Sequence, residues 1–316
     1  MDDTDRIITK CPSSFFFCGS SWGVSFHIGV YKGMIEKWGY DKLFNSKFMG
    51  NSAGAVIALA IALQIPWEEL EKLYIEFSEK ALNNGMIGKM SLYHETVLNR
   101  IIKNDDDYKK LNGRLYVGVT TYFNKYTLIS EWENNQDLKD TLHSSLHIPL
   151  YCNYIKKLNI GRAIDGAFGS IYEKLDKTTL IINPLTQYRG DIVCKPKLTF
   201  QDCFYQMSKK KYYEIRDNGY KEIMKWDGKY NIFDKKKPSS SLIAFFWMLR
   251  YLEEVSKTEI LKLITMFFMI YLWKYKKHSN FIINQSTKFF IYLKLSTLEI
   301  IRELSEPNLL ISLTNN

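Results

Sequence analysis

A five-residue segment, Gly50-Asn51-Ser52-Ala53-Gly54, separates the short apolar stretch KFM from the run of small residues AVIALAIAL. A G-x-S-x-G pattern in this setting predicts a sharp strand-to-helix turn that exposes the serine hydroxyl. The two glycines permit a tight backbone and the close approach of neighbouring elements. The free N–H groups and the dipole of the following helix favour negative charge beside the serine. The alternative is a glycine-rich turn in which Ser52 only caps the helix.

Strand and helix patterns alternate along the first 194 residues. Apolar runs predict strands at Ser14–Cys18, Lys47–Gly50, Leu115–Phe123, Thr127–Glu131, Asn159–Ile164 and Thr179–Ile182. Helical patterns cover Val24–Trp38, Ser52–Leu63, 67–82, 90–103 and 135–145. The dense charge run Asp105–Asp107 predicts a solvated loop. Alternation of this kind is typical of the α/β class, with a mostly parallel sheet and helices on both faces.

A second glycine-containing turn, Gly19-Ser20-Ser21-Trp22-Gly23, joins the first predicted strand to the first predicted helix. Backbone N–H groups in such a turn can point at a carbonyl oxygen and form an oxyanion hole for a tetrahedral intermediate. The segment by itself also fits an ordinary strand-to-helix loop. Its position one strand before the serine motif favours the oxyanion interpretation.

A nucleophilic serine needs a base, and the histidines are poorly placed for that role. In the chain order of α/β-hydrolases only His278 could follow an acid near residue 165, and it lies in the lysine-rich segment KYKKHSN. His27 falls on the apolar face of the first predicted helix and is interpreted as a core residue. His143 and His147 flank the residues SSL and are interpreted as structural.

Asp165, in the segment Ile164-Asp165-Gly166-Ala167, ends an apolar strand and is a different candidate for the base. Sites assemble at strand ends along one edge of a parallel sheet. A partly buried carboxylate held near Ser52 could take its proton directly, without an imidazole. Because Asp-Gly is also a plain turn signal, this fragment alone leaves both interpretations open.

Composition places the chain among ordinary globular proteins. Its 316 residues are 46% apolar and 24% charged, which is enough for one large core. The five cysteines are odd in number and form no C-x-x-C pair, so neither a disulfide framework nor a zinc site is predicted. Cys18 is expected to be a small core residue. The acidic N-terminal segment MDDTDRIITK has the wrong polarity for a secretory signal peptide, so we expect a cytoplasmic protein.

The positive charge of the chain is confined to its last two fifths. Residues 1–194 hold 22 Lys plus Arg against 22 Asp plus Glu, whereas residues 195–316 hold 21 against 12, so this part carries the whole net charge of +9. This shift predicts a boundary near residue 195, between a domain at 1–195 and a basic, mainly helical region at 196–316.

The basic region contains apolar runs at 241–252, 263–273 and 289–295, each too short to span a bilayer. The clusters Lys235–Lys237 and Lys274–Lys277 border these runs. Such segments suit a membrane interface with cations toward anionic head groups, and they equally suit a buried helical subdomain with a basic rim. Nucleic acid is not expected as a partner, because the basic residues flank apolar runs instead of forming a stripe.

Four blocks of the chain resemble the patatin-like phospholipases, especially their eukaryotic adiponutrin-like branch. The blocks are FFFCGSSWGVSFHIGVYKGM, GNSAGAVIALAIAL, ISEWENNQDLKDTLHSSLHIPLYC and RAIDGAFGS, and together they span about residues 14–185. The glycine turn, the G-x-S-x-G pattern, the S-S-x-H-I-P-L-Y segment and the Asp-Gly occur in the family's order and at similar separations.

The resemblance implies a three-layer α/β/α fold and assigns roles to particular residues. Ser52 and Asp165 would form a Ser–Asp dyad, Gly19, Ser20 and Ser21 would hold the oxyanion loop, and Gly50, Gly54 and Gly166 would be the motif glycines. No metal or organic cofactor is implied. The expected function is that of a serine acyl hydrolase that cleaves carboxylic esters of glycerolipids, with peripheral contact to a membrane or lipid droplet.

One departure from the family pattern lies in the oxyanion loop, where Ser20 and Ser21 replace glycines that are common in the family. Serine supplies a backbone N–H but resists a positive φ, so turnover could be reduced. Two alternatives therefore stay open: a catalytically weak or inactive protein that binds lipid membranes or droplets, and a soluble esterase or thioesterase.

Overall fold

The computed structural model describes residues 9–86, 88–121, 125–149, 151–152, 156–185 and 190–231. These residues belong to one compact unit, Met1–Pro238. The remaining residues include His278, Lys235–Lys237 and the three C-terminal apolar runs, so the expectations that concern them lie outside the described residues.

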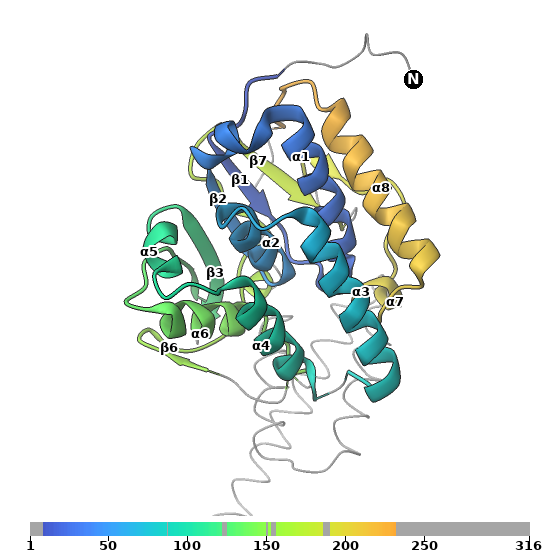
Figure 1. Ribbon diagram of the computed structural model, residues 1–316. Helices are drawn as coiled ribbons and strands as arrows, with labels where there is room; N and C mark the ends of the chain where they lie inside the picture. Colours follow the sequence, from blue (N-terminus) through green and yellow to red (C-terminus); the bar gives the residue numbers. More distant parts are fainter. Residues whose placement is uncertain are drawn as a thin grey trace, which may run out of the picture. The chain divides into compact units, whose positions relative to one another are not determined.

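A mixed, mostly parallel sheet forms the centre of this unit, as the sequence pattern predicts (Figure 1). Its strands are β1 (Ser14–Phe17), β2 (Lys47–Asn51), β3 (Leu115–Thr121), β4 (Lys125–Ile129), β5 (Lys157–Leu158), β6 (Gly161–Asp165), β7 (Thr179–Asn183) and β8 (Ile192–Val193). Their order is β5-β6-β3-β2-β1-β7-β8, with β4 also paired to β3. Strands β3, β2, β1, β7 and β8 run parallel, whereas β4 and β6 are antiparallel to β3.

Helices follow most of the parallel strands. They are α1 (Val24–Phe44), α2 (Ala53–Ala62), α3 (Trp67–Asn84), α4 (Met90–Ile101), α5 (Asp107–Leu111), α6 (Asn135–Ser145), α7 (Phe200–Phe204) and α8 (Lys209–Lys225), with 3-10 turns η2 (Ser21–Gly23) and η4 (Gly166–Phe168). The predicted end of the first helix at Trp38 coincides with a break at Gly39, where φ is 77°. The short helix α5 and the strand β8 have no counterpart among the predicted elements.

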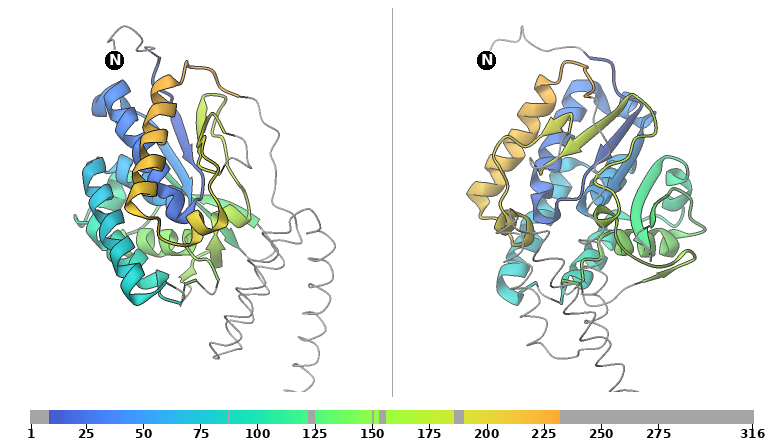
Figure 2. Two further views of the ribbon diagram at one scale, coloured as in Figure 1. Left: turned by 90° about the vertical axis from the view of Figure 1, so that its right-hand side faces the viewer. Right: turned by 180° about the vertical axis from the view of Figure 1, so that it is seen from behind.

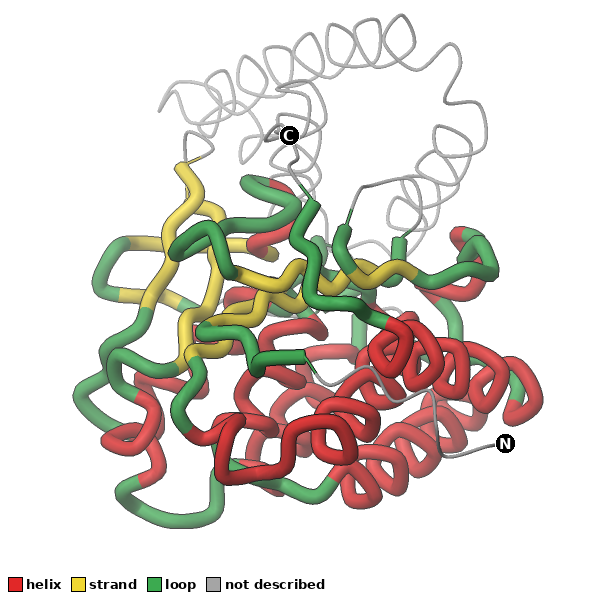
Figure 3. The backbone as a smooth tube through the Cα atoms, turned by 90° about the horizontal axis from the view of Figure 1, so that it is seen from above, coloured by secondary structure: helices red, strands yellow, loops and turns green. Residues whose placement is uncertain are grey.

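The two faces of the sheet are covered unequally. Phe15 and Phe17 point to the face that carries the larger core, together with side chains of α1, α2 and α3. Phe16 and Met49 point to the opposite face, where a small cluster is closed by Tyr172, which follows η4. Figure 3 shows most of the helices on one side of the strands. Because β1 is buried on both faces, it reads as the unbroken apolar run that is typical of a central parallel strand.

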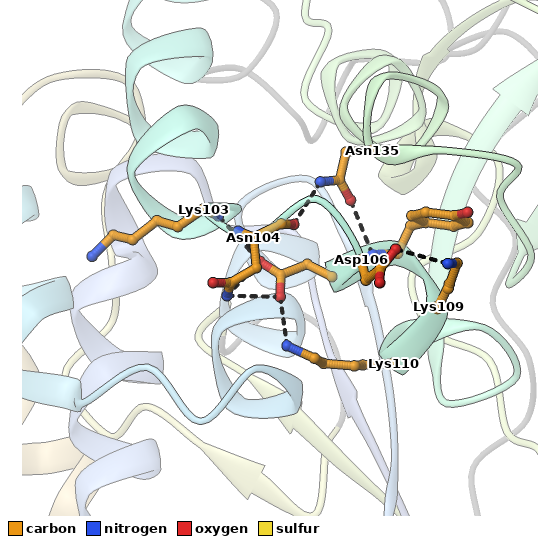
Figure 4. A network of polar contacts seen from close by, with 8 residues as sticks. Lys103, Asn104, Asp106, Lys109, Lys110 and Asn135 are labelled. Atoms are coloured by element: carbon orange, nitrogen blue, oxygen red, sulfur yellow. Dashed lines mark hydrogen bonds and ion pairs between the residues drawn. The ribbon is translucent and has the colours of Figure 1, made fainter.

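The charge run Asp105–Asp107 is only partly the solvated loop that its composition predicts. Asp107 is buried, and its carboxylate accepts hydrogen bonds from the backbone N–H groups of Lys103 and Asn104, at 3.1 and 2.9 Å. Lys110 Nζ lies 3.0 Å from the same carboxylate (Figure 4). These charge-assisted bonds compensate the burial of Asp107, and they hold the short helix α5 ahead of β3. A count of charges along the chain cannot show this compensation.

The compact unit extends beyond the boundary that the charge shift predicts near residue 195. Helix α8 packs along α1, and both views of Figure 2 show the two helices side by side. A side chain at Gly29 of α1 would overlap the Arg216 carbonyl, and one at Gly219 of α8 would overlap the Phe26 carbonyl. The two backbones are therefore in direct contact. Helix α8 contributes part of the positive charge after residue 195 through its exposed lysines, whereas its buried face completes the core.

No helix in the described ranges combines the length and the apolar character that crossing a membrane requires.

The contact between α1 and α8 predicts that Gly29→Ala destabilises the unit strongly. The added methyl group overlaps backbone atoms, which cannot rotate away as a side chain can. Overpacking typically costs about 1–3 kcal/mol, and we expect a loss at the upper end of this range in urea unfolding. The matched control is Lys221→Ala, at an exposed position of α8. Equal stability of the two variants would contradict a backbone contact between the helices.

Candidate active site

Ser52 lies at a tight turn between β2 and α2 and has a strained backbone conformation, with φ 54° and ψ −133°. The turn is possible because two glycines leave room for it. A side chain at Gly50 would overlap the backbone of Gly54, and one at Gly54 would overlap the Phe17 carbonyl of β1. The strand-to-helix turn predicted from the sequence is therefore present, and it sets the serine at the amino end of α2.

Ser145 holds the strained turn against β3. The backbone N–H of Ser52 donates to Ser145 Oγ at 2.9 Å, and Ser145 Oγ donates to the Gly118 carbonyl at 2.7 Å. All three groups are buried. Because an unpaired buried N–H is costly, the last residue of α6 stabilises the conformation of Ser52. Ser145 belongs to the S-S-x-H-I-P-L-Y segment, and nothing in that segment by itself indicates that this serine supports the Ser52 turn.

Asp165 comes beside Ser52 through the antiparallel register of β6. Asp165 pairs with Val119 of β3, and the preceding residue Gly118 pairs with Asn51 of β2. The Asp165 backbone N–H donates to the His147 carbonyl at 3.1 Å. The sequence analysis placed Asp165 at a common carboxyl edge of parallel strands, and this reason is wrong. An antiparallel neighbour of β3 delivers the residue instead.

The Asp165 carboxyl group is buried, with 2% of the residue exposed. Burial raises its pKa to about 7, and hydrogen bonds from the Ser52 side chain and the Ala167 backbone N–H lower it in part. The bond from Ala167 to Asp165 Oδ1 measures 2.9 Å. The group thus combines contact with the serine hydroxyl and a proton affinity near neutrality, as a general base requires.

The turn that begins at Gly19 packs against Ser52 and Ala167. At Gly19 an added Cβ would lie 3.2 Å from Ser52 Cβ and 3.1 Å from Ala167 Cβ, so little more than glycine fits. Ser20 is buried, and Ser21 begins η2 with a positive φ of 47°. The serine that departs from the family pattern therefore adopts the conformation that glycine favours.

An apolar cavity of about 140 Å³ reaches Ser52. Its wall is formed by residues of η2 and of α1 to α4, with the segment after α6: Ser21, Trp22, Val24, Ile28, Ser52, Ala53, Val56, Ile57, Leu70, Leu73, Tyr74, Phe77, Met90, Tyr93, His94, Val97, Leu146, Ile148 and Tyr151. Among the described residues of this wall there is no Asp, Glu, Lys or Arg. Such a lining suits an aliphatic chain.

Asn51, inside the G-x-S-x-G segment, is a further site residue that the sequence analysis did not single out. Its Nδ2 donates to the Ser170 carbonyl at 2.7 Å, and its Oδ1 accepts from the Tyr126 hydroxyl at 2.8 Å. A side chain at Gly166 would overlap the Gly118 carbonyl. Asn51 therefore links β2 to the residues that follow Asp165. In the sequence, its position next to Ser52 was the one indication of this role.

The other groups considered in the sequence lie elsewhere. His27 Nε2 donates to the Cys18 carbonyl at 2.8 Å, and its ring packs against Phe17. Burial lowers the pKa of His27 to about 4, which agrees with its interpretation as a core residue. Cys18 is buried in the sheet. No group of three His, Cys, Asp or Glu side chains in the described part could hold a metal ion.

The family model described as patatin-like phospholipase matches residues 16–171, a range that includes Gly19, Ser52 and Asp165. Omega-hydroxyceramide transacylase of Mus musculus is 28% identical over 173 residues, which cover 51% of this chain and 28% of that protein. The 1-acylglycerol-3-phosphate O-acyltransferase Pnpla3 of Mus musculus is 24% identical over 202 residues, which cover 61% of this chain and 48% of that protein. The chain thus spans less than half the length of these relatives.

Two solved structures are also similar in outline. The heterodimeric complex ExoU-SpcU from the type III secretion system of Pseudomonas aeruginosa aligns with a TM-score of 0.40 and 12% identity, over 67% of this chain and 50% of that chain. VipD from Legionella pneumophila aligns with a TM-score of 0.40 and 12% identity, over 89% of this chain and 79% of that chain.

The family match and the curated relatives agree with the resemblance carried by the sequence blocks, including its adiponutrin-like branch. Residues 16–171 of the chain form a domain of the patatin-like phospholipase family.

Proposed function

We propose that this protein transfers acyl groups from carboxylic esters of glycerolipids through an acyl-enzyme on Ser52, with Asp165 as the base. The observation that carries the proposal is that the Ser52 side chain acts on the buried Asp165 carboxyl group and lowers its pKa, while Ser52 also lines an apolar cavity. Family membership and the acyl-transfer activities in the names of the relatives support the same reaction class.

The proposed reaction begins when Ser52 Oγ attacks the ester carbonyl carbon and its proton passes to Asp165. Backbone N–H groups of residues 19–21 stabilise the negative oxygen of the tetrahedral intermediate. Collapse of the intermediate breaks the bond to the alcohol, and protonated Asp165 returns the proton to the leaving oxygen. The acyl group then remains on Ser52 as an ester.

The second half reverses these steps with a different acceptor. Asp165 takes a proton from the incoming hydroxyl group, whose oxygen attacks the acyl carbon. The bond from this carbon to Ser52 Oγ then breaks, and protonated Asp165 returns the proton to Ser52 Oγ. Water as the acceptor gives hydrolysis, and a second alcohol gives transacylation. The proposed substrate is a glycerolipid because the wall of the cavity is apolar and uncharged, which suits a fatty acyl chain.

The nucleophile is tested by Ser52→Ala, which removes the oxygen that carries the acyl group. We expect ester turnover and labelling by a fluorophosphonate to be lost, while circular dichroism and the unfolding midpoint change little. The matched control is Ser144→Ala, since Ser144 is buried and its Oγ has no hydrogen-bond partner in the described part of the chain. Full labelling of Ser52→Ala would contradict the proposal, and an unlabelled wild type would favour a lipid-binding protein without catalysis.

The base is tested by Asp165→Asn, which keeps the shape of the side chain but cannot take a proton. We expect turnover to fall by orders of magnitude, whereas His278→Ala retains it. Because the pKa of Asp165 is raised to about 7, wild-type kcat/KM should increase with pH through about 7 as the carboxylate forms. Loss of activity in His278→Ala with activity kept in Asp165→Asn would replace the dyad by a triad.

The raised pKa of Asp165 also predicts a change in stability. The unfolded state loses its proton near pH 4 and the folded state only near pH 7, so stability from this group falls as pH rises between these values. Each pKa unit corresponds to about 1.4 kcal/mol. Urea titrations give the unfolding free energy of Asp165→Asn minus that of wild type. This difference should increase by a few kcal/mol from pH 4 to pH 8. A difference that does not change with pH would contradict burial of an ionisable Asp165.

We also propose that the protein meets its substrate at a lipid surface through the basic region beyond the described residues. Support comes from the excess of positive charge after residue 195 and from the apolar runs bordered by lysines. Each lysine near an anionic surface contributes about 1 kcal/mol. Removal of everything after residue 195 would be a poor test, because α8 completes the core.

Charge substitution tests this contact without shortening the chain. We expect Lys235, Lys236 and Lys237 changed together to Gln to weaken co-sedimentation with anionic vesicles at low salt. The control is the other run of three lysines, Lys209, Lys210 and Lys211, which begins α8 and borders no apolar run. Absence of vesicle binding by the full chain at low salt would assign the basic region to another role.

A further inference from the structure

His94 presents an imidazole in the wall of the apolar cavity that reaches Ser52. It lies on the same face of α4 as Met90, Tyr93 and Val97, which also line the cavity. No motif in the sequence indicates a role for His94, and the reaction proposed above does not involve it. Its Nδ1 atom is buried and has no hydrogen-bond partner among the residues that the structure describes.

Four aromatic residues of the cavity wall also carry polar atoms, and these atoms form hydrogen bonds within the protein. Trp22 Nε1 donates to the Tyr151 hydroxyl at 3.0 Å, and that hydroxyl donates to the Phe204 carbonyl at 2.6 Å. The Tyr74 hydroxyl donates to the Trp22 carbonyl at 3.3 Å, and the Tyr93 hydroxyl donates to the Gly85 carbonyl at 2.9 Å. These side chains therefore present rings to the cavity, whereas His94 keeps hydrogen-bonding capacity.

The charge state of His94 restricts what it can bind. Burial, with smaller contributions from His143 and His147, lowers its pKa to about 3. The ring is neutral at physiological pH and offers one N–H donor and one nitrogen acceptor. The described wall of the cavity holds no Asp, Glu, Lys or Arg that could compensate a charged ligand group.

We propose that His94 is a specificity-determining residue that hydrogen bonds a hydroxyl group on the part of the ester substrate that enters the cavity. This inference rests on the proposed function of Ser52. A hydroxyl is the complementary group because it both donates and accepts, and so matches either tautomer of a neutral imidazole. The apolar wall around it binds the hydrocarbon that carries the hydroxyl.

The hydroxyl has two possible sources, the acyl chain and the alcohol of the ester, and the experiment separates them. One arm compares p-nitrophenyl dodecanoate with a series of p-nitrophenyl hydroxydodecanoates that carry the hydroxyl at different carbons. The other arm compares the glyceryl and propyl monoesters of dodecanoic acid. In each arm the measured quantity is the ratio of kcat/KM for the hydroxylated and the plain ester.

We expect kcat/KM of wild type to be about ten- to a hundredfold higher for the hydroxylated ester in one arm. The reason is that the plain ester leaves a polar group of the binding site unpaired. His94→Leu should bring this ratio close to one, and His94→Gln, which keeps a donor and an acceptor, should restore part of it. Tyr93→Phe is the matched control, because its hydroxyl is bonded within the protein and the ratio should stay as in wild type.

Two results would overturn the inference: no preference by wild type in either arm, or a preference that His94→Leu leaves unchanged. Failure of the proposed function is recognised separately, because wild type would then turn over neither ester and Ser52 would not react with a fluorophosphonate. In that case the inference falls with it. A wild type that is labelled but lacks selectivity rejects only the role of His94.

Discussion

The candidate site depends on one steric constraint, the close approach of backbone segments around Ser52. Gly54 packs against the end of β1, and Gly50 packs against Gly54, so the chain can reverse from β2 into α2 within a single residue. Ser52 takes the strained conformation that this reversal requires, and Ser145 compensates its backbone N–H. The sheet positions β1, β2 and β3 closely enough for this turn, and the packing of α2 follows from it.

A second constraint is electrostatic and opposes folding. Asp165 is buried against the serine turn and receives hydrogen bonds from only two groups that lower its pKa, so its ionised form is disfavoured. Asp107 shows the contrast within the same unit. Asp107 is also covered but lies less deep in the protein, and two backbone N–H groups and a lysine stabilise its charge, so its pKa is lowered. The charge of the carboxylate that supports α5 is compensated, whereas the carboxyl group beside Ser52 keeps a raised pKa.

The cavity shows the same division between structure and chemistry. The polar atoms of Trp22 and Tyr93 form hydrogen bonds within the protein, so these side chains present apolar rings to the cavity. In the described wall, His94 differs because its Nδ1 has no such bond. The helices α3 and α4 supply eight of the nineteen residues that line the wall, and neither contains a motif that marks it in the sequence. Their amphipathic patterns predict buried faces. The sequence pattern of such a face is the same whether the face contacts another helix or a cavity.

The sequence by itself determined the local features: the strand-to-helix turn at Ser52, the alternation that makes a mostly parallel sheet, and the core position of His27. These follow from short-range sterics and periodicity, which a single segment expresses. Only the tertiary structure decided how Asp165 reaches Ser52, because strand direction and register depend on partners distant in the chain. It also decided that α8 belongs to the core and that Ser145 and Asn51 support the turn. Net charge and composition average over both faces of an element, so they cannot show which residues a fold brings into contact.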